Sequence, residues 1–330
     1  MEWSMPNLRL VTWNIGGAKF LREKKPVQNA LRTRINQGLT ELIQKHQPDL
    51  ILLQETVRYG HSEHPTDFIR PPAGYYYDVS VAIDTLMQTH PSKWSTYRSG
   101  GHWSQKDYLA QGLGMLWKKD MAHAPIWEFR GIAGPVIEKE IVRLETGLYT
   151  GDRDTEPRLA VVTHFMISNK DQLRDIFIVH LHLSTLKGER EKFPRMDDLG
   201  SRTRLEQIEV ILNGIVSRYE EWRLQTGYDE KKPSALWILA GDFNCTPDSP
   251  EIQKIERMNF IDMNPDKGQG SKGQGFPENR AEITVDYIFA GPRHHVFETK
   301  SLQTVIQNNS TPLYHLTGSD HYPVLAEVPV

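Results

Sequence analysis

Several short, apolar, strand-like runs in this sequence end in polar or charged residues. The run ends lie at Trp13-Asn14, Gln54-Glu55, His180–Leu183, Gly241–Asn244, Val285–Tyr287 and Ser319–His321. In layered proteins that combine helices and sheets, strand ends converge on one rim, so residues far apart in the chain share one pocket. The sequence therefore predicts a layered α/β fold with a polar pocket along one rim.

Length and composition favour a soluble, globular chain. It has 330 residues, of which 38% are apolar and 25% charged, so it can bury a sizeable core. No apolar run approaches the roughly 20 residues that a membrane helix needs. Cys245 is the single cysteine, which excludes an intrachain disulfide, and no signal peptide is evident. We expect one domain over residues 1–330 in a cytoplasmic monomer without a membrane span.

Hydrophobic spacing predicts two long helices and a set of strands. Helical spacing covers residues 27–43, in a helix ending near Pro48, and residues 205–222. Strands are expected at 8–13, 49–55, 112–117, 159–167, 176–183, 235–240, 284–290, 302–306 and 322–328. Residues 56–107 are expected to form a long excursion, and the glycine-rich residues 268–275 a mobile loop. The packing that suits this order is a two-sheet sandwich flanked by helices.

Two strand ends carry acidic residues suited to metal and water chemistry. Glu55 is either an exposed rim carboxylate or a ligand of Mg²⁺, which often takes only one or two protein carboxylates. Asp242 and Asn244 lie two positions apart, so on an extended strand both face one side while Phe243 packs on the other. They either form an Asx-type turn or orient a water nucleophile.

A buried carboxylate and a histidine form a candidate pair. Asp286 lies in an apolar stretch, where burying a carboxylate is costly unless it is paired. His321, at the start of the last expected strand, is the candidate partner. The pair is either structural or catalytic; in the second case the carboxylate raises the basicity of the imidazole and fixes its tautomer. Asn14 is a candidate for orienting a carboxylate or a phosphate.

Two histidines share one strand face at His180 and His182. Zinc normally takes three or four nitrogen or sulfur ligands at suitable spacing, so this pair does not indicate a zinc site. One of the two is expected to be a hydrogen-bonded core residue. We assign His182 as the donor to a phosphoryl oxygen or leaving group.

Together these side chains predict an acid-rich pocket that needs a cation before it accepts an anionic phosphodiester. Mg²⁺, with Mn²⁺ as the alternative, would act there as Lewis acid and template. His321 with Asp286 is then the expected base, and Asp242 with Asn244 positions the water.

The order Trp-Asn, Gln-Glu, His-Leu, Gly-Asp-x-Asn, Asp-Tyr-Ile and Ser-Asp-His resembles the endonuclease/exonuclease/phosphatase superfamily over residues 8–328. The resemblance implies a four-layer α/β sandwich of two mostly antiparallel β-sheets, packed face to face and flanked by helices. It also implies phosphoester hydrolysis that depends on Mg²⁺ or Mn²⁺. By position, Glu55 would bind the metal, Asn14 would support the metal and phosphate site, and Asp320 would lie near the metal. His182 would hold the catalytic position of the deoxyribonuclease branch.

The motifs do not select one branch of the superfamily. Gly16 stands where apurinic endonucleases carry an acid, and His182 stands where they favour tyrosine. Val285-Asp286-Tyr287 differs from the Cys-Asp-Arg of inositol-phosphate 5-phosphatases. The Gly-Asp-Phe-Asn run resembles deadenylase-like branches, and the His-Leu-Ser stretch resembles tyrosyl-DNA phosphodiesterases.

The segment between Leu186 and Leu205 carries six basic and four acidic side chains, a net charge of +2. It is either a solvated loop and helix start or a phosphate-gripping lid, in which Lys187 and Arg204 are the candidate substrate contacts. Aromatic residues between positions 75 and 103 are either packed or stack on splayed bases. The net charge of −3 argues against a protein that coats duplex nucleic acid but allows a small cationic groove.

Three functions fit these patterns. The first is a metal-dependent nuclease or other nucleic-acid phosphodiesterase that uses an activated water and acts on DNA or RNA, including single strands. The second is a phosphatase or phosphodiesterase for a small-molecule or lipid phosphoester. The third is a non-catalytic binding module, against which the presence of Asp242 and His321 argues. The first is our working hypothesis.

Overall fold

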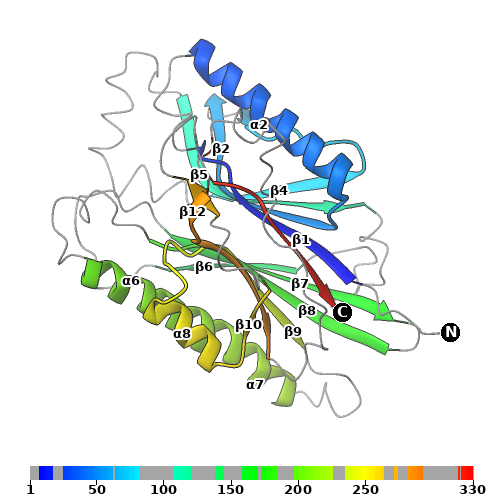
Figure 1. The fold of residues 1–330 in the computed structure, drawn as a ribbon. Coiled ribbons are helices and arrows are strands. Elements are labelled where there is room, and N and C mark those ends of the chain that lie inside the picture. Colours follow the sequence, from blue (N-terminus) through cyan, green and yellow to red (C-terminus); the bar gives the residue numbers. More distant parts are fainter. Residues whose placement is uncertain are drawn as a thin grey trace.

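The chain folds into two six-stranded sheets that face each other, with helices on the outer side of each sheet (Figure 1). This four-layer α/β sandwich is the architecture predicted from the sequence. The computed structural model describes residues 7–17, 25–61, 64–81, 107–119, 138–144, 158–169, 172–184, 197–225, 235–263, 271–273, 281–292, 319 and 321–329.

The first sheet consists of β1 (Asn7–Asn14), β2 (Leu50–His61), β3 (His64–Asp67), β4 (Tyr75–Val81), β5 (Asp107–Lys118) and β14 (Val324–Pro329). The strand order is β14-β1-β2-β5-β4, and β3 pairs with the second half of β2. β1 and β2 run parallel, whereas the other neighbouring pairs in this order are antiparallel.

The second sheet consists of β6 (Glu138–Arg143), β7 (Leu159–Asn169), β8 (Gln172–His182), β9 (Leu236–Asp242), β10 (Ile261–Asp262) and β13 (Asp286–Gly291). Its order is β10-β13-β9-β8-β7-β6, with β8 and β9 as the parallel pair. The expected antiparallel pairing of β7 with β8 is confirmed. A separate small ribbon pairs β11 (Lys272–Gly273) with β12 (Ala281–Ile283).

Helices form the two outer layers (Figure 1). The helix α2 (Lys25–His46) covers the first sheet, as its predicted apolar stripe requires. Over the second sheet run α6 (Asp197–Glu209), the π-helical segment η3 (Val210–Ser217), α7 (Arg218–Gln225) and α8 (Pro250–Arg257). Ser249 caps α8, and Pro250 occupies its first turn, which is the arrangement expected at a helix start. None of the described helices has the length and apolar character to cross a membrane.

The inner strands are buried on both faces, which explains their near-continuous apolar sequences. On β2, Leu50 and Leu52 pack between the two sheets, while Ile51 and Leu53 pack beneath α2. A third cluster lies between the second sheet and its helices. Where such a run is apolar and fully buried, as at Leu50–Leu53, the polar residue that ends it marks the rim.

Some sequence expectations need correction. Residues 56–107 do not form one long excursion, because β2 continues to His61 and is followed by β3 and β4. The strand β6 was not predicted. Within the glycine-rich run expected to be a mobile loop, Ser271 is fully buried. The strand expected at 302–306 lies outside the described residues.

A buried polar contact joins the sheets beneath the rim. Gln54 on β2 reaches across to His180 on β8, and their Nε2 atoms are 2.8 Å apart. Burial lowers the pKa of His180 to about 3. His180 is therefore a neutral core histidine near neutral pH.

Replacing Gly241 by alanine is expected to destabilise the protein by about 3 kcal/mol or more. Gly241 has a φ of +151°, and a Cβ atom there would lie 1.9 Å from the backbone oxygen of Leu181. Chemical denaturation followed by circular dichroism measures the loss. Gly214→Ala is the matched control, since its Cβ would meet only Val210 at 4.0 Å and alanine favours helix. An unchanged unfolding midpoint for Gly241→Ala would contradict the close packing of β8 on β9.

Acid is expected to destabilise the protein through His180. Its pKa is lowered from 6.5 to about 3 by folding, so the unfolded state binds more protons between those values. Its contribution to stability is therefore complete above the unfolded pKa and falls below it by up to about 1.4 kcal/mol per pH unit. Urea unfolding at a series of pH values measures the slope. The His180→Gln variant should lose this part of the slope, and equal slopes for both proteins would refute the assignment.

Candidate active site

Three adjacent strands of the second sheet end in a row of functional side chains. His182 on β8 lies directly beside Asp242 on the parallel strand β9. Asp242 in turn lies directly opposite Asp286 on the antiparallel strand β13. Residues paired across a ladder project to the same face of the sheet, so these three side chains share one stretch of the rim.

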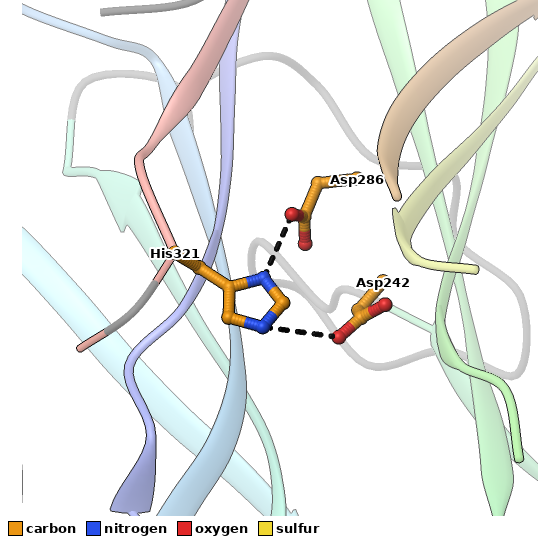
Figure 2. A group of neighbouring side chains, drawn as sticks. All are labelled: Asp242, Asp286 and His321. Atoms are coloured by element: carbon orange, nitrogen blue, oxygen red, sulfur yellow. Dashed lines mark hydrogen bonds and ion pairs between the residues drawn. The ribbon is translucent and has the colours of Figure 1, made fainter. Parts of the chain in front are cut away.

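The row places two buried carboxylates next to each other. Asp242 is 1% exposed and Asp286 is 0% exposed. Like charges directly opposite each other on paired strands repel, so the pair needs donors around it. His321, just before β14, lies between them, with Nδ1 at 2.8 Å from Oδ2 of Asp286 and Nε2 at 3.7 Å from Oδ2 of Asp242 (Figure 2). The predicted contact between Asp286 and His321 is therefore confirmed.

The contact with Asp286 fixes which nitrogen of His321 can act. An ionised carboxylate only accepts hydrogen bonds, so Nδ1 carries the proton and donates it to Oδ2 of Asp286. In the neutral ring, Nε2 then keeps its lone pair and faces the side of Asp242. This is the arrangement of a base that takes a proton from water.

Asn14, at the end of β1, links the two sheets through its amide group. Its Nδ2 donates to Oε1 of Glu55 at 3.1 Å and to Oδ2 of Asp242 at 2.9 Å. Its Oδ1 accepts the backbone N–H of Gly16 at 3.0 Å. The amide nitrogen thus separates two negative charges, and the metal-supporting role predicted for Asn14 stays a prediction.

Two site residues adopt a left-handed backbone conformation. Glu55 has a φ of +56° and Asn244 a φ of +52°. At Glu55 the ladder between β2 and β5 shifts register, between Leu53 and Thr56. Strained conformations of this kind cost about 1–3 kcal/mol each and concentrate at functional sites. The strain supports a functional role for both residues, and neither conformation is encoded in a periodic sequence pattern.

Asn244 fixes the orientation of the Asp242 carboxylate. Its backbone N–H donates to Oδ1 of Asp242 at 2.8 Å, while its side-chain amide donates to the carbonyl of Leu183 at 2.9 Å. Both oxygens of Asp242 therefore have defined partners. The contact from the Asn244 N–H to the Asp242 carboxylate is the Asx-type turn expected as one alternative. The positioning of water by Asp242 and Asn244 stays a prediction.

The imidazole of His182 lies on the other side of Asp242. Its Nε2 is 3.6 Å from Oδ2 of Asp242, and its Nδ1 is 2.8 Å from Nη1 of Arg158. His182 is 6% exposed and Arg158 is 8% exposed. Arg158 was not identified from the sequence, although it directly precedes a predicted strand and so carries the same signal as the other polar residues at strand ends.

Arg204 lies beneath the rim rather than on the surface. It is 4% exposed, and its Nε donates to Oε1 of Glu251 at 2.7 Å. Such a buried ion pair joins α6 to α8, and it gives Arg204 a structural role below the end of β8. Its predicted contact with substrate stays a prediction. Lys187 and Asp320, also predicted for the site, lie outside the described residues.

Ser271 is a site residue that the sequence did not reveal. Its hydroxyl donates to Oδ2 of Asp286 at 2.7 Å and accepts the backbone N–H groups of Val285 and Asp286. It is fully buried. A serine in a glycine-rich run has no periodicity that could have indicated this contact.

The donor groups fit a divalent cation. Ligand atoms of Asp242, Asp286 and His321 all lie within 4.8 Å of one another. Oδ1 of Asp286 is buried and has no hydrogen-bond partner among the described residues. A buried carboxylate oxygen of this kind is costly unless a cation or donor meets it, and hard divalent cations prefer oxygen ligands.

A histidine between two buried carboxylates, at the rim of a four-layer sandwich, is an arrangement suited to phosphoester hydrolysis. The chain belongs to the endonuclease/exonuclease/phosphatase family, whose model matches residues 11–321. This confirms the family identified from the six motifs. A search of the curated proteins found no match to the chain.

Solved structures share the fold along nearly the whole chain. A protein of the same family from Bacteroides thetaiotaomicron is 16% identical, with a TM-score of 0.55 and 98% of both chains covered. A mannosyl-6-phosphatase from Bacteroides thetaiotaomicron VPI-5482 is 16% identical, with a TM-score of 0.53 and 97% of this chain and 99% of that chain covered. TDP2 from D. rerio, complexed with a single-strand DNA product, is 15% identical, with a TM-score of 0.51 and 98% and 99% covered. At these identities the likeness shows the fold alone.

Replacing Ser271 by alanine is expected to destabilise the protein by about 2–3 kcal/mol, because two buried N–H groups lose their acceptor and the Asp286 carboxylate loses one of its donors. Thermal and urea unfolding measure the change. Ser217→Ala is the matched control: its hydroxyl donates to the Leu212 carbonyl on a half-buried helix face, so the loss should stay below about 1 kcal/mol. Equal losses for the two variants would contradict the role given to Ser271.

Proposed function

We propose that the protein is a metal-dependent phosphodiesterase of nucleic acids that uses an activated water. The observation that carries this proposal is the position of His321 between Asp286 and Asp242. Its Nε2 faces the space beside a second carboxylate, where a water would be both oriented and deprotonated. We further propose that the protein acts as a cytoplasmic monomer.

Each residue of the rim receives a role in this proposal. His321, oriented by Asp286, takes a proton from the attacking water, and Asp242 with Asn244 positions that water. His182 donates a hydrogen bond to a phosphoryl oxygen or to the leaving group.

A cation belongs to the same proposal. Glu55, Asn14 and Asp320 hold Mg²⁺, or Mn²⁺ in its place, which when bound neutralises negative charge on the phosphoryl oxygens. Without a cation, the neighbouring carboxylates of Glu55, Asp242 and Asp286 would repel a phosphodiester. The buried Oδ1 of Asp286, which has no hydrogen-bond partner among the described residues, and the neighbouring carboxylate of Asp242 support a cation at this rim.

Nucleic acid is the proposed substrate, DNA or RNA and including single strands. The excess of basic over acidic residues between Leu186 and Leu205, which remains when the buried Arg204 is left out, supports it, with Lys187 as a proposed phosphate contact. The TDP2 neighbour, which shares the fold, binds a single-strand DNA product. The overall charge of −3 also leaves room for a small-molecule or lipid phosphoester, which the experiment below separates.

Cleavage of end-labelled single- and double-stranded DNA and RNA tests the proposal. We expect cutting with Mg²⁺ or Mn²⁺, no cutting with EDTA, and a loss of about 10²–10⁴-fold in the Asp242→Asn variant, because general-base and water-positioning groups contribute on that order. Labels at the 5′ and 3′ ends give the polarity from the product ladder.

Asp248→Asn is the matched control, since this exposed residue lies in the connection between β9 and α8. It should retain the activity of the unaltered protein. A folded, metal-loaded protein that cuts no oligonucleotide but hydrolyses a sugar phosphate or a lipid headgroup would replace the nucleic-acid assignment with the small-phosphoester one.

A further inference from the structure

The second histidine of the site, His182, has a cation at its Nδ1, where His321 has a carboxylate. Nη1 of Arg158 lies 2.8 Å from Nδ1 of His182, and both side chains are buried. Arg158 directly precedes β7, and the imidazole lies between its guanidinium and Oδ2 of Asp242, which is 3.6 Å from Nε2. The buried guanidinium of Arg158 therefore contacts an imidazole nitrogen although the pocket also contains carboxylates that could pair with it.

The chemistry of the guanidinium decides where the imidazole proton is. Arginine has five N–H donors, no acceptor, and stays charged in proteins. At 2.8 Å it must donate, so Nδ1 of His182 must offer its lone pair. The single ring proton of His182 therefore resides on Nε2, which faces Asp242.

The two histidines of the site are thus held in opposite tautomers. His321 has the carboxylate of Asp286 at its Nδ1, so its proton lies on Nδ1 and its lone pair on Nε2. His182 has the guanidinium of Arg158 at its Nδ1, so its lone pair lies on Nδ1 and its proton on Nε2. Both Nε2 atoms lie near the same oxygen, Oδ2 of Asp242, at 3.6 and 3.7 Å.

We propose that Arg158 is a positioning residue that holds His182 as the neutral Nε2–H tautomer and so makes it a hydrogen-bond donor to a phosphoryl oxygen. Neutral His182 cannot release that proton, because this would leave an imidazolate ion. The water oxygen bonds to phosphorus as the P–O bond to the leaving group breaks; the proton taken from water goes to Nε2 of His321, and the leaving oxygen takes its proton from solvent. The Nε2–H of His182 stabilises the charge that develops on a phosphorus-bound oxygen without transferring its proton. This role rests on the proposed function, whereas the tautomer itself does not.

Nuclear magnetic resonance of protein labelled with ¹⁵N at histidine tests the tautomer without any substrate. In long-range ¹H–¹⁵N spectra, a protonated and an unprotonated ring nitrogen have widely separated shifts. The His182→Gln variant identifies the His182 signals by their loss. We expect a protonated Nε2 and an unprotonated Nδ1 in the unaltered protein. A protonated Nδ1 would overturn the proposal.

Substitution of Arg158 tests whether this residue sets the tautomer. Arg158→Met should give signals averaged between the two tautomers, and Arg158→Lys, which keeps a donor, should restore Nε2–H. The matched control is Arg9→Met, which removes an exposed arginine paired with Glu327. An unchanged tautomer in Arg158→Met would overturn the proposal. If Arg158→Met does not fold, the histidine signals of Arg158→Lys and of the unaltered protein test the proposal. Both should show a protonated Nε2 of His182, and a protonated Nδ1 in either would overturn it.

Kinetics then separate this inference from the proposed function. With a cleaved oligonucleotide, Arg158→Met should lower kcat by about 10- to 100-fold, by analogy with the loss of side chains that orient metal-bound histidines, while KM is unchanged. A raised KM with unchanged kcat would instead assign Arg158 to substrate binding and overturn its positioning role. If no oligonucleotide is cut by the unaltered protein while His182 shows the Nε2–H tautomer, the proposed function fails and the tautomer assignment stands.

Discussion

The rim is organised by two carboxylates that the sheet places directly opposite each other. Asp242 and Asp286 pair in register on β9 and β13, and both are buried, so their repulsion must be balanced by neighbouring donors. His321 approaches both, Asn14 donates to the first, and Ser271 donates to the second. These three come from separate parts of the chain: the end of β1, the residues before β11 and the segment before β14. The two carboxylates are thus stabilised by side chains from three parts of the chain that are far apart in sequence.

Much of this arrangement could be predicted from the sequence. The layers follow from apolar runs that are buried on both faces, and the rim follows from the polar residues that end those runs. The meeting of Asp286 with His321 was predicted because a carboxylate in an apolar stretch needs a partner. The family followed from the order of the motifs, and its match to residues 11–321 confirms it.

The remaining features depend on geometry that a linear pattern does not contain. The left-handed turn at Glu55 arises from a register shift between β2 and β5, and a shift is a property of two strands together. Ser271 reaches Asp286 from a glycine-rich run without periodicity. Arg204 has the sequence context of an exposed helix start, yet its pairing with Glu251 buries it, because α8 packs against α6. For each of these residues, the role depends on the strand or side chain that it contacts, which the residue type alone does not reveal.

The contact between His321 and Asp286 crosses from one sheet to the other, and this has a consequence for how the protein matures. His321 belongs to the segment that leads into the first sheet, while Asp286 begins a strand of the second. A folding intermediate with either sheet formed alone would lack the contact between His321 and Asp286. The strand that follows His321 is the last of the described strands in chain order. On the proposed function, hydrolytic chemistry therefore becomes available only after the two sheets have docked, and we expect partly folded chains to be inert towards phosphoesters.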